Sequence, residues 1–272
     1  MNQPRHFQHP WIQLLILALI TLVVIVFVAM SGMLELPLDR EMKEGEAVGQ
    51  TDLPDFREYS AGDSRKTVFF EFLKPIVRAE NREIRQSRER IKKLAARLRE
   101  GDISEEQWDW LRDMARRYRV DLANNTRKGV AEALLRRVDV IPEPLVLVQA
   151  AKESAWGTSR FAREGNNLFG QWCFTEGCGM VPARRAPGKS HEVETFESVR
   201  VAVASYLRNL NSHPAYAEMR EIRARRREAG KPLTAFALAG GLQNYSEQGE
   251  KYVSEVRAMI RRNGLEEGAR ES

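Results

Sequence analysis

The sequence predicts a mainly α fold (α+β) with one small β element, preceded by a helical extension and by one transmembrane helix. Three observations lead to this prediction. Apolar residues recur at helical spacing over most of the chain from Thr67 onward. The stretch HEVETF alternates apolar and polar residues, which fits a short strand. An uncharged run from Trp11 to Met30 has the length of a membrane span.

The uncharged run WIQLLILALITLVVIVFVAM predicts a membrane anchor at residues 11–31, after a short N-terminus at residues 1–10. A helix of about 20 residues spans about 30 Å, the thickness of the hydrocarbon core. Arg5 precedes the run, whereas Glu35 and Asp39 follow it. The positive-inside rule therefore places the N-terminus in the cytoplasm and the bulk of the chain outside. A cleaved signal peptide is the alternative, but the run is long for one and no A-x-A site follows it.

Residues 32–66 are mixed in composition and are predicted to form a tether, and residues 67–137 are predicted to form a helical extension. The first helix of the extension ends at Gly101, and Ser104 with Gln107 forms a capping box that begins the second. A third helix completes the extension. Residues at helical spacing define the inward faces of the three helices: Ile84, Ile91, Leu94 and Leu98; Trp108, Leu111, Ala115 and Tyr118; Val130, Leu134 and Leu135.

A second domain is predicted at residues 138–264, followed by a short tail at residues 265–272. Pro144 suits the first turn of a helix, and LVLVQAAKES after it is apolar nearly all round, which predicts a buried helix stopped by Gly157. Turn-forming residues dominate from Asn166 to Lys189, before the predicted strand. Two more helices are expected between residues 231 and 262. The helix SVRVAVASYLRNLN is predicted to bury Val199, Val203, Tyr206 and Leu210.

The net charge of +5 suits partners that are polyanions, such as nucleic acid, anionic lipid or an anionic cell-wall polymer. The alternative is a solvated surface on Arg-rich helices. A location outside the cytoplasm argues against nucleic acid, and nothing besides charge favours it.

The sequence contains two cysteines, Cys173 and Cys178, in the motif CFTEGC. Outside the cytoplasm such a pair is predicted to form a disulfide that makes a short loop rigid. A zinc site is disfavoured because the chain has only 4 histidines. Two of them, His6 and His9, lie on the other side of the predicted membrane span.

Glu153 is the only carboxylate of the apolar stretch LVLVQAAKES, and it lies in the last turn of the predicted helix. Apolar surroundings and the negative end of the helix dipole both raise the pKa of a carboxyl group. A carboxylic acid that stays protonated near neutral pH can donate its proton to a leaving oxygen. The alternative is that Glu153 pairs with an arginine or points to solvent from the helix end.

The stretch LVQAAKESAWGTSRFAREGNNLFG resembles the glucosaminidase family, the family-73 glycoside hydrolases that cut bacterial cell-wall glycan. It contains the family's E-S-x-W-G and N-N-x-F-G patterns. Two later blocks, FESVRVAVASYLRNLNSHPAY and GLQNYSEQGEKYVSEVRAMI, resemble a helix and the closing segment of the family, so that the resemblance covers about residues 138–262. The helical extension, the cysteine loop and the anchor resemble its Bax-type subgroup.

The resemblance implies a lysozyme-like catalytic domain that hydrolyses the β-1,4 bond after N-acetylglucosamine, with Glu153 as general acid. The implied partners are peptidoglycan glycan strands and the bacterial inner membrane, with a single-pass anchor and the catalytic domain in the periplasm. No cofactor, metal or nucleic acid is expected, and protein partners are left open.

Two carboxylates are expected for either retaining or inverting hydrolysis. Many relatives present the second one on a β-lobe that is short in this chain. The candidates here are Glu176, Glu192 and Glu194. A substrate-assisted route through the sugar's N-acetyl group is the alternative. Tyr245 is a candidate for orienting water or the acetamido group, or else for packing.

Residues of the matched motifs are also candidates for binding the glycan. Trp172 is expected to stack on a sugar ring, whereas Trp156 and Phe169 are also expected to pack the helix end. The complete set of candidate substrate-binding residues is Trp156, Asn167, Phe169, Trp172 and Tyr206.

Two other functions fit the same residues. A lytic transglycosylase on the same scaffold needs only one Glu and leaves anhydro-muramic ends, whereas a glucosaminidase leaves reducing-end N-acetylglucosamine. A non-catalytic glycan-binding or envelope-scaffold protein is the other alternative. A wall amidase is disfavoured because a metal type needs more histidines and a Cys–His type needs a free thiol.

Overall fold

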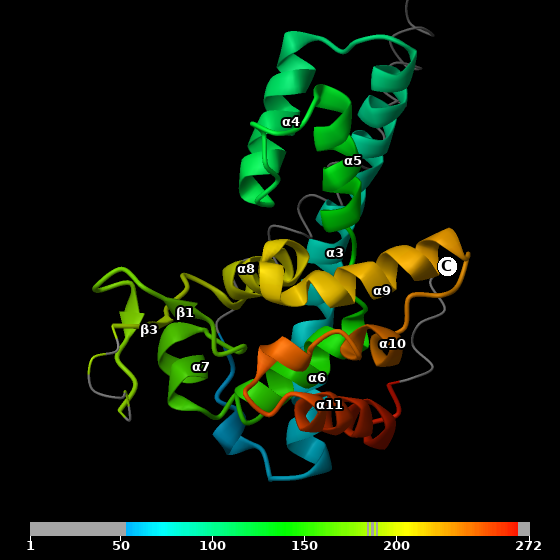
Figure 1. Cartoon of the computed structure of the whole chain (residues 1–272). Coiled ribbons are helices and arrows are strands. Elements are labelled where there is room, and N and C mark those ends of the chain that lie inside the picture. Colours follow the sequence, from blue (N-terminus) through cyan, green and yellow to red (C-terminus); the bar gives the residue numbers. More distant parts are fainter. Residues whose placement is uncertain (1–52, 184, 186–187, 189, 266–272) are drawn as a thin grey trace, which may run out of the picture. The chain divides into compact units, whose positions relative to one another are not determined.

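The computed structural model describes residues 53–183, 185, 188 and 190–265 (Figure 1). The predicted N-terminus, the predicted anchor at residues 11–31 and residues 266–272 lie outside this part of the chain. Within the part that the structure describes, no helix combines the length and the apolar composition needed to cross a bilayer.

The described part begins with a short 3-10 turn, η1 (Phe56–Glu58), and the 38-residue helix α3 (Asp63–Glu100). Phe56 is completely buried and packs edge-on against Phe69 of α3, with ring centroids 5.2 Å apart. The sequence assigned residues 32–66 to a tether. From η1 onward that segment instead belongs to the folded body, because Phe56 fixes it in the core.

Helices α4 (Glu105–Arg117) and α5 (Arg127–Arg137) lie beside the C-terminal half of α3 (Figure 1). The predicted capping box is present: the Ser104 hydroxyl accepts from the backbone of Gln107, and the Gln107 side chain accepts from the backbone of Ser104. Most of the predicted inward residues of these helices are buried, and Trp108, Leu98 and Leu135 are partly buried against the same core.

The predicted buried helix is α6 (Glu143–Glu153), which contacts α3, α10 and α11. It ends at Glu153, earlier than the predicted stop at Gly157, because Ser154 caps it. The other helices and 3-10 turns are α7 (Arg160–Gly165), α8 (Val199–Ser212), η2 (Pro214–Tyr216), α9 (Ala217–Glu228), α10 (Ala235–Ala239), η3 (Gln243–Tyr245) and α11 (Glu250–Arg262). Helix α9 was not predicted.

A three-stranded antiparallel sheet lies next to α7, in the strand order β1–β3–β2 (Figure 1). The strands are β1 (Trp172–Cys173), β2 (Gly179–Met180) and β3 (Glu192–Glu194). Strand β3 confirms the strand predicted in HEVETF. Cys173 and Cys178 form the predicted disulfide, with 6.2 Å between their Cα atoms.

The helical extension and the rest of the described body share one continuous apolar core. A buried ionic cluster also joins them. Asp139 lies 3.0 Å from Nη2 of Arg227 and 3.5 Å from Nη2 of Arg88. The fully buried Arg223 donates to the backbone oxygen of Asp139. Burial acts to raise the pKa of Asp139, but the three guanidinium groups outweigh it and the pKa is lowered.

Candidate active site

Glu153 is the last residue of α6, one helical turn after the buried Gln149. Burial raises the pKa of the Glu153 carboxyl above its ordinary value. A hydrogen bond from Tyr252 and the charge of Lys152 offset part of this rise. The direction of the shift agrees with the prediction made from the sequence. Within the described residues, no arginine or lysine forms an ion pair with Glu153, so the expected alternative of an arginine partner is not observed.

A chain of three hydrogen bonds ends on the Glu153 carboxyl. The Tyr206 hydroxyl donates to Oε1 of Gln149 at 2.5 Å, and Nε2 of Gln149 donates to the Tyr252 hydroxyl at 2.9 Å. The Tyr252 hydroxyl then donates to Oε1 of Glu153 at 2.9 Å. Each hydroxyl has one proton, so the chain has a fixed direction. Oε1 of Glu153 is therefore an acceptor, and a proton on this carboxyl belongs on Oε2.

Tyrosine rings surround this chain of hydrogen bonds. The ring of Tyr245 stacks on Tyr252 with centroids 5.2 Å apart, and its hydroxyl donates to the Phe169 carbonyl at 3.0 Å. Burial raises the pKa of Tyr216 to about 12, with a contribution from the charge of Glu153. The same two causes act on every tyrosine of the cluster, so all remain protonated and can act as donors: Tyr206, Tyr216, Tyr245 and Tyr252.

The backbone reverses immediately after Glu153 through residues in the left-handed region. The φ angles of Ala155, Trp156 and Gly157 are 52°, 61° and 75°. Residues other than glycine rarely adopt this conformation. The Ser154 hydroxyl stabilises the turn by accepting from the Gly157 amide at 2.8 Å. A Cβ atom on Gly157 would lie only 2.2 Å from Cδ2 of Phe56, so both the angle and the space at this position require glycine.

Trp156 packs the end of α6, as one of its two predicted roles requires. Its ring contacts Phe69 and Phe70 edge-on, with centroid distances of 5.8 Å and 5.3 Å. Lys152, on the other side of Glu153 in the sequence, pairs with Glu255 at 2.5 Å and lies 5.5 Å from the ring centroid of Tyr252. Contacts with α11 thus hold Lys152 before the turn, and contacts with α3 hold Trp156 within it.

Three of the predicted substrate-binding residues are buried supports instead. Only 2% of Asn167, 2% of Phe169 and 1% of Tyr206 is exposed, which leaves no surface for a glycan. The Asn167 amide donates to the carbonyls of Gln171 and Glu194 at 2.9 Å and 2.8 Å. Phe169 stacks on Tyr206 with centroids 3.9 Å apart. The N-N-x-F-G segment therefore connects the tyrosine cluster to the sheet.

Of the predicted substrate-binding residues, Trp172 has the most accessible surface, with 57% of it exposed, whereas Trp156 is partly buried. Its ring stacks on His191 with centroids 4.2 Å apart. Trp172 and Glu194 both line a hollow of about 210 Å³. Burial raises the pKa of Glu194, and the charge of Arg208 offsets part of the rise.

The other two candidate carboxylates belong to the disulfide loop. Glu192 is buried and accepts from the backbone amides of Gly177 and Gly179 at 3.2 Å and 2.9 Å. Glu176 lies exposed in the loop between the two cysteines. Glu192 also lies close to both cysteine sulfurs. Those sulfurs are joined in a disulfide, so this group offers no thiolate to a metal.

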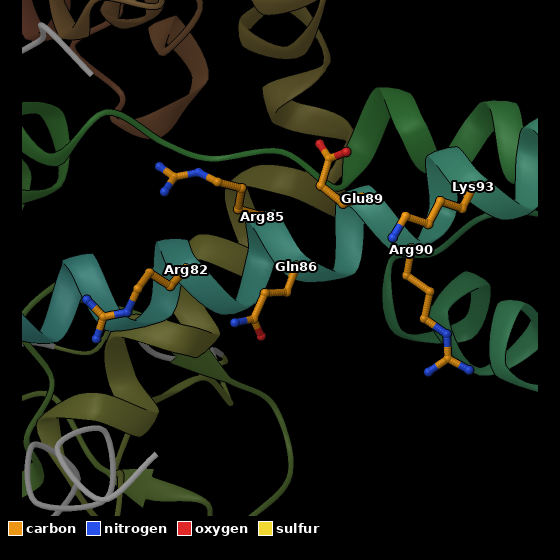
Figure 2. A pocket seen from close by; sticks show the side chains of 6 residues that line it. All are labelled: Arg82, Arg85, Gln86, Glu89, Arg90 and Lys93. Atoms are coloured by element: carbon orange, nitrogen blue, oxygen red, sulfur yellow. The ribbon is translucent and has the colours of Figure 1, made fainter. Parts of the chain in front are cut away.

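A second hollow, of about 540 Å³, lies on the exposed surface of α3 (Figure 2). Figure 2 shows that its side chains point in different directions and do not converge on one point. All of them come from this one helix, which is typical of a solvated basic surface. They are Arg82, Arg85, Gln86, Glu89, Arg90 and Lys93.

Gln149 and Tyr252 were not among the predicted site residues. Gln149 is a polar residue inside a helix that is otherwise apolar, at the spacing that places it on the same face as Glu153. That position is a usable signal in the sequence. Tyr252 occupies a buried position of α11, and nothing in its local pattern separates it from a core tyrosine.

Comparison with known proteins matches the part of the chain that contains these residues to one family. The glucosaminidase family model, described as mannosyl-glycoprotein endo-beta-N-acetylglucosaminidase, matches residues 128–265. This range contains the whole hydrogen-bond chain and the disulfide. Protein bax of Escherichia coli (strain K12) is 39% identical over 213 residues, which cover 78% of this chain and 75% of that protein. No solved structure matches the chain.

Proposed function

Because the chain belongs to the glucosaminidase family and is of the Bax type, we propose that it hydrolyses the β-1,4 bond after N-acetylglucosamine in peptidoglycan, with Glu153 as general acid. Family membership makes the chain a glycosidase related to peptidoglycan. The observation that carries the finer proposal is the directed hydrogen-bond chain from Tyr206 through Gln149 and Tyr252 to Glu153.

The chain of hydrogen bonds suits proton donation. Burial raises the pKa of Glu153, which favours the protonated acid near neutral pH. Tyr252 occupies Oε1 as a donor, so the transferable proton is on Oε2. Donation of that proton to the glycosidic oxygen makes the departing sugar a good leaving group, typically worth about 10²–10⁴-fold in rate. The Tyr252 hydroxyl then remains to stabilise the carboxylate that forms.

Burial and hydrogen bonding favour Glu194 among the three candidate second carboxylates. Glu192 is occupied by two backbone amides, and Glu176 lies on the exposed loop. Glu194 is partly buried, has a raised pKa and lines a hollow together with the exposed Trp172. We assign it the role of positioning water in the hydrolytic route. Tyr245 is better suited to packing, because its hydroxyl proton is already donated to a carbonyl.

A lytic transglycosylase is the second candidate function. One observation favours it. Among the described residues, the Glu153 carboxyl accepts a hydrogen bond from a tyrosine, and the hydrogen-bond chain that leads to it contains only tyrosines and a glutamine. A transglycosylase reaction uses a single Glu, so it needs no second carboxylate beside Glu153. The two functions differ in their products.

Digestion of purified peptidoglycan by the full-length protein in detergent tests the proposal. Wild-type protein is expected to release fragments with reducing-end N-acetylglucosamine, whereas anhydro-muramic ends would support the transglycosylase. Glu153→Gln is expected to fold and to release neither. Glu164→Gln, at an exposed position on α7, is the matched control and is expected to keep wild-type activity. Cleavage by Glu153→Gln at near wild-type rate would contradict the assignment of the general acid.

We also propose that residues 11–31 anchor the protein in the bacterial inner membrane, with the catalytic domain in the periplasm. The uncharged run and the charges around it support this location. The Cys173–Cys178 disulfide fits an oxidising compartment. A reporter fused after Ser272 is expected to behave as periplasmic, and protease added to spheroplasts is expected to digest it. Protection of the reporter in intact spheroplasts would contradict the proposal.

A further inference from the structure

The hollow beside Trp172 is lined by the helical extension as well as by the glucosaminidase domain. Arg117 lies at the end of α4, and Arg119 follows in the next turn. Arg208 comes from α8, and Trp172 and Glu194 come from the sheet. We call this site the basic hollow. The family match begins at residue 128, so Arg117 and Arg119 are contributed by a part of the chain that precedes it.

The basic hollow gathers positive charge that the rest of the described chain does not neutralise. Arg117, Arg119 and Arg208 are exposed, and none of their side chains forms an ion pair or a hydrogen bond within the described residues. Glu194 is the only carboxylate among the residues that line the hollow. Guanidinium groups present several N–H donors in a plane, an arrangement that matches the two oxygens of a carboxylate.

The walls of the basic hollow are fixed to each other. Arg119 has a φ of 57°, a left-handed conformation that is uncommon for arginine. One nitrogen of Arg137 donates both to the carbonyl of Tyr118, at 2.8 Å, and to the carbonyl of Ser212 at the end of α8, at 2.9 Å. This pair of hydrogen bonds ties the turn that carries Arg119 to the helix that carries Arg208. The guanidinium groups are thus presented from a preorganised frame.

An aromatic face completes the hollow. Trp172 is more than half exposed, and its stacking on His191 restricts the orientation of its ring. A flat apolar surface beside several guanidinium groups suits a ligand that has both a ring and an acidic substituent. A neutral oligosaccharide would use the ring and leave the arginines without a partner.

We propose that the basic hollow binds a carboxylate of the peptidoglycan strand, and that the helical extension thereby adds substrate recognition to the glucosaminidase domain. This inference rests on the proposed function. Two carboxylates of the substrate share the required chemistry: those of the peptide stem and, where the stem has been removed, that of the lactyl group on muramic acid.

Binding measured on the non-cleaving full-length Glu153→Gln protein in detergent tests the inference. Three ligands of matched length are compared: strands that retain their peptide stems, strands stripped of stems by an amidase, and chitin oligosaccharides, which have no carboxylate. The test variant adds Arg117→Gln and Arg119→Gln. Arg116→Gln is the matched control, because Arg116 lies on the same helix but pairs with Asp113 at 2.8 Å and does not line the hollow.

The double arginine variant is expected to bind at least one of the two acidic ligands about 10-fold more weakly, as loss of hydrogen bonds to a charged group implies. Binding of chitin oligosaccharides is expected to stay unchanged, and Arg116→Gln is expected to bind all three ligands like its parent. A loss confined to stem-bearing strands assigns the carboxylate to the stem. A loss confined to stripped strands assigns it to the lactyl group, and a loss for both shows that the hollow accepts either carboxylate.

Unchanged binding of both acidic ligands would overturn the inference, and so would an equal loss for chitin oligosaccharides. Arg208→Gln, on a different helix, repeats the test if the double variant does not fold, as judged by thermal unfolding. The proposed function fails separately, if the wild-type protein releases no product from any strand. Binding to the Glu153→Gln protein still reports on the hollow in that case.

Discussion

The hydroxyl of Tyr252 donates a hydrogen bond of 2.9 Å to Oε1 of Glu153 and accepts one of 2.9 Å from Nε2 of Gln149. The Gln149 amide is oriented with its oxygen toward the Tyr206 hydroxyl, which donates to it. The hydrogen-bond chain that positions the proton on Glu153 thus begins three hydrogen bonds away, at Tyr206 on α8. This relationship determines how activity and stability should respond to substitutions and to pH.

The Tyr252→Phe variant is expected to move the alkaline limb of the pH–rate profile to higher pH. The hydrogen bond from Tyr252 lowers the pKa of Glu153, so its loss raises that pKa, and a general acid stays protonated up to a higher pH. The rate is expected to fall about 10-fold or more, because the carboxylate formed after proton transfer loses a donor. The measurement is kcat/KM for glycan cleavage as a function of pH.

Tyr245→Phe is the control for this prediction. The Tyr245 hydroxyl donates to the Phe169 carbonyl and not to Glu153, so its removal is expected to leave the alkaline limb in place. An unmoved limb in Tyr252→Phe would show that the hydroxyl does not set the pKa of Glu153.

Glu153→Gln is expected to unfold at a higher temperature than the wild type at neutral pH. The folded-state pKa of Glu153 is raised above its unfolded value, so the folded protein binds more protons between the two pKa values. The wild type therefore loses stability as the pH rises through this window, and the variant does not. The unfolding temperatures of the two proteins should converge below about pH 4, where the Glu153 carboxyl of the wild type is protonated in both the folded and the unfolded state. A Glu153→Gln protein that is less stable at every pH would point to a structural role for the carboxylate.

Asp139→Asn is expected to destabilise the protein by about 3–5 kcal/mol, because it leaves buried guanidinium groups without their anion. The folded-state pKa of Asp139 is lowered, so its contribution is present above the unfolded pKa and is lost as the pH falls through the folded one. The variant should thus lose less stability in acid than the wild type. Urea unfolding at several pH values measures both effects. Asp113→Asn, which removes an exposed pair with Arg116, should change stability by less than about 1 kcal/mol.

Replacement of Cys173 and Cys178 by Ser is expected to lower activity more than stability. The disulfide closes a short loop, for which the chain-entropy estimate is about 2 kcal/mol. Cys173 follows Trp172 directly in β1, so loosening the loop displaces the exposed ring. A rise in KM together with a small change in the unfolding midpoint would fit this account. Equal and large losses of stability and activity would show that the loop supports the whole fold.

Features with local causes were predictable from the sequence. The capping box at Ser104 and the buried α6 follow from residue type and spacing within one helix. The raised pKa of Glu153 follows from the apolar residues next to it in the chain. The family motif, in turn, identified the segment in which the site is found.

Features that join distant segments were not predictable. Helix α9 escaped prediction because Arg220 and Arg223 fill buried positions where a pattern search expects apolar residues. The hydrogen bond between Gln149 and Tyr252 joins residues 103 apart in the sequence, and only the fold brings them together. For the same reason the motif residue Asn167 was predicted to contact substrate, whereas its amide holds two backbone carbonyls.

Helix α3 limits how this catalytic domain can be exchanged between proteins. The family match begins after α3 ends, yet α3 contacts α6 and α8, and its Glu80 pairs with Arg200 of α8 at 2.6 Å. A fusion that transplants residues 128–265 alone would leave the apolar surface of α6 uncovered and Phe56 absent from beneath Gly157. The segment that matches the family, residues 128–265, is therefore shorter than the smallest segment that can be transferred with the site intact. Recombination that preserves the site has to take the chain from η1 onward.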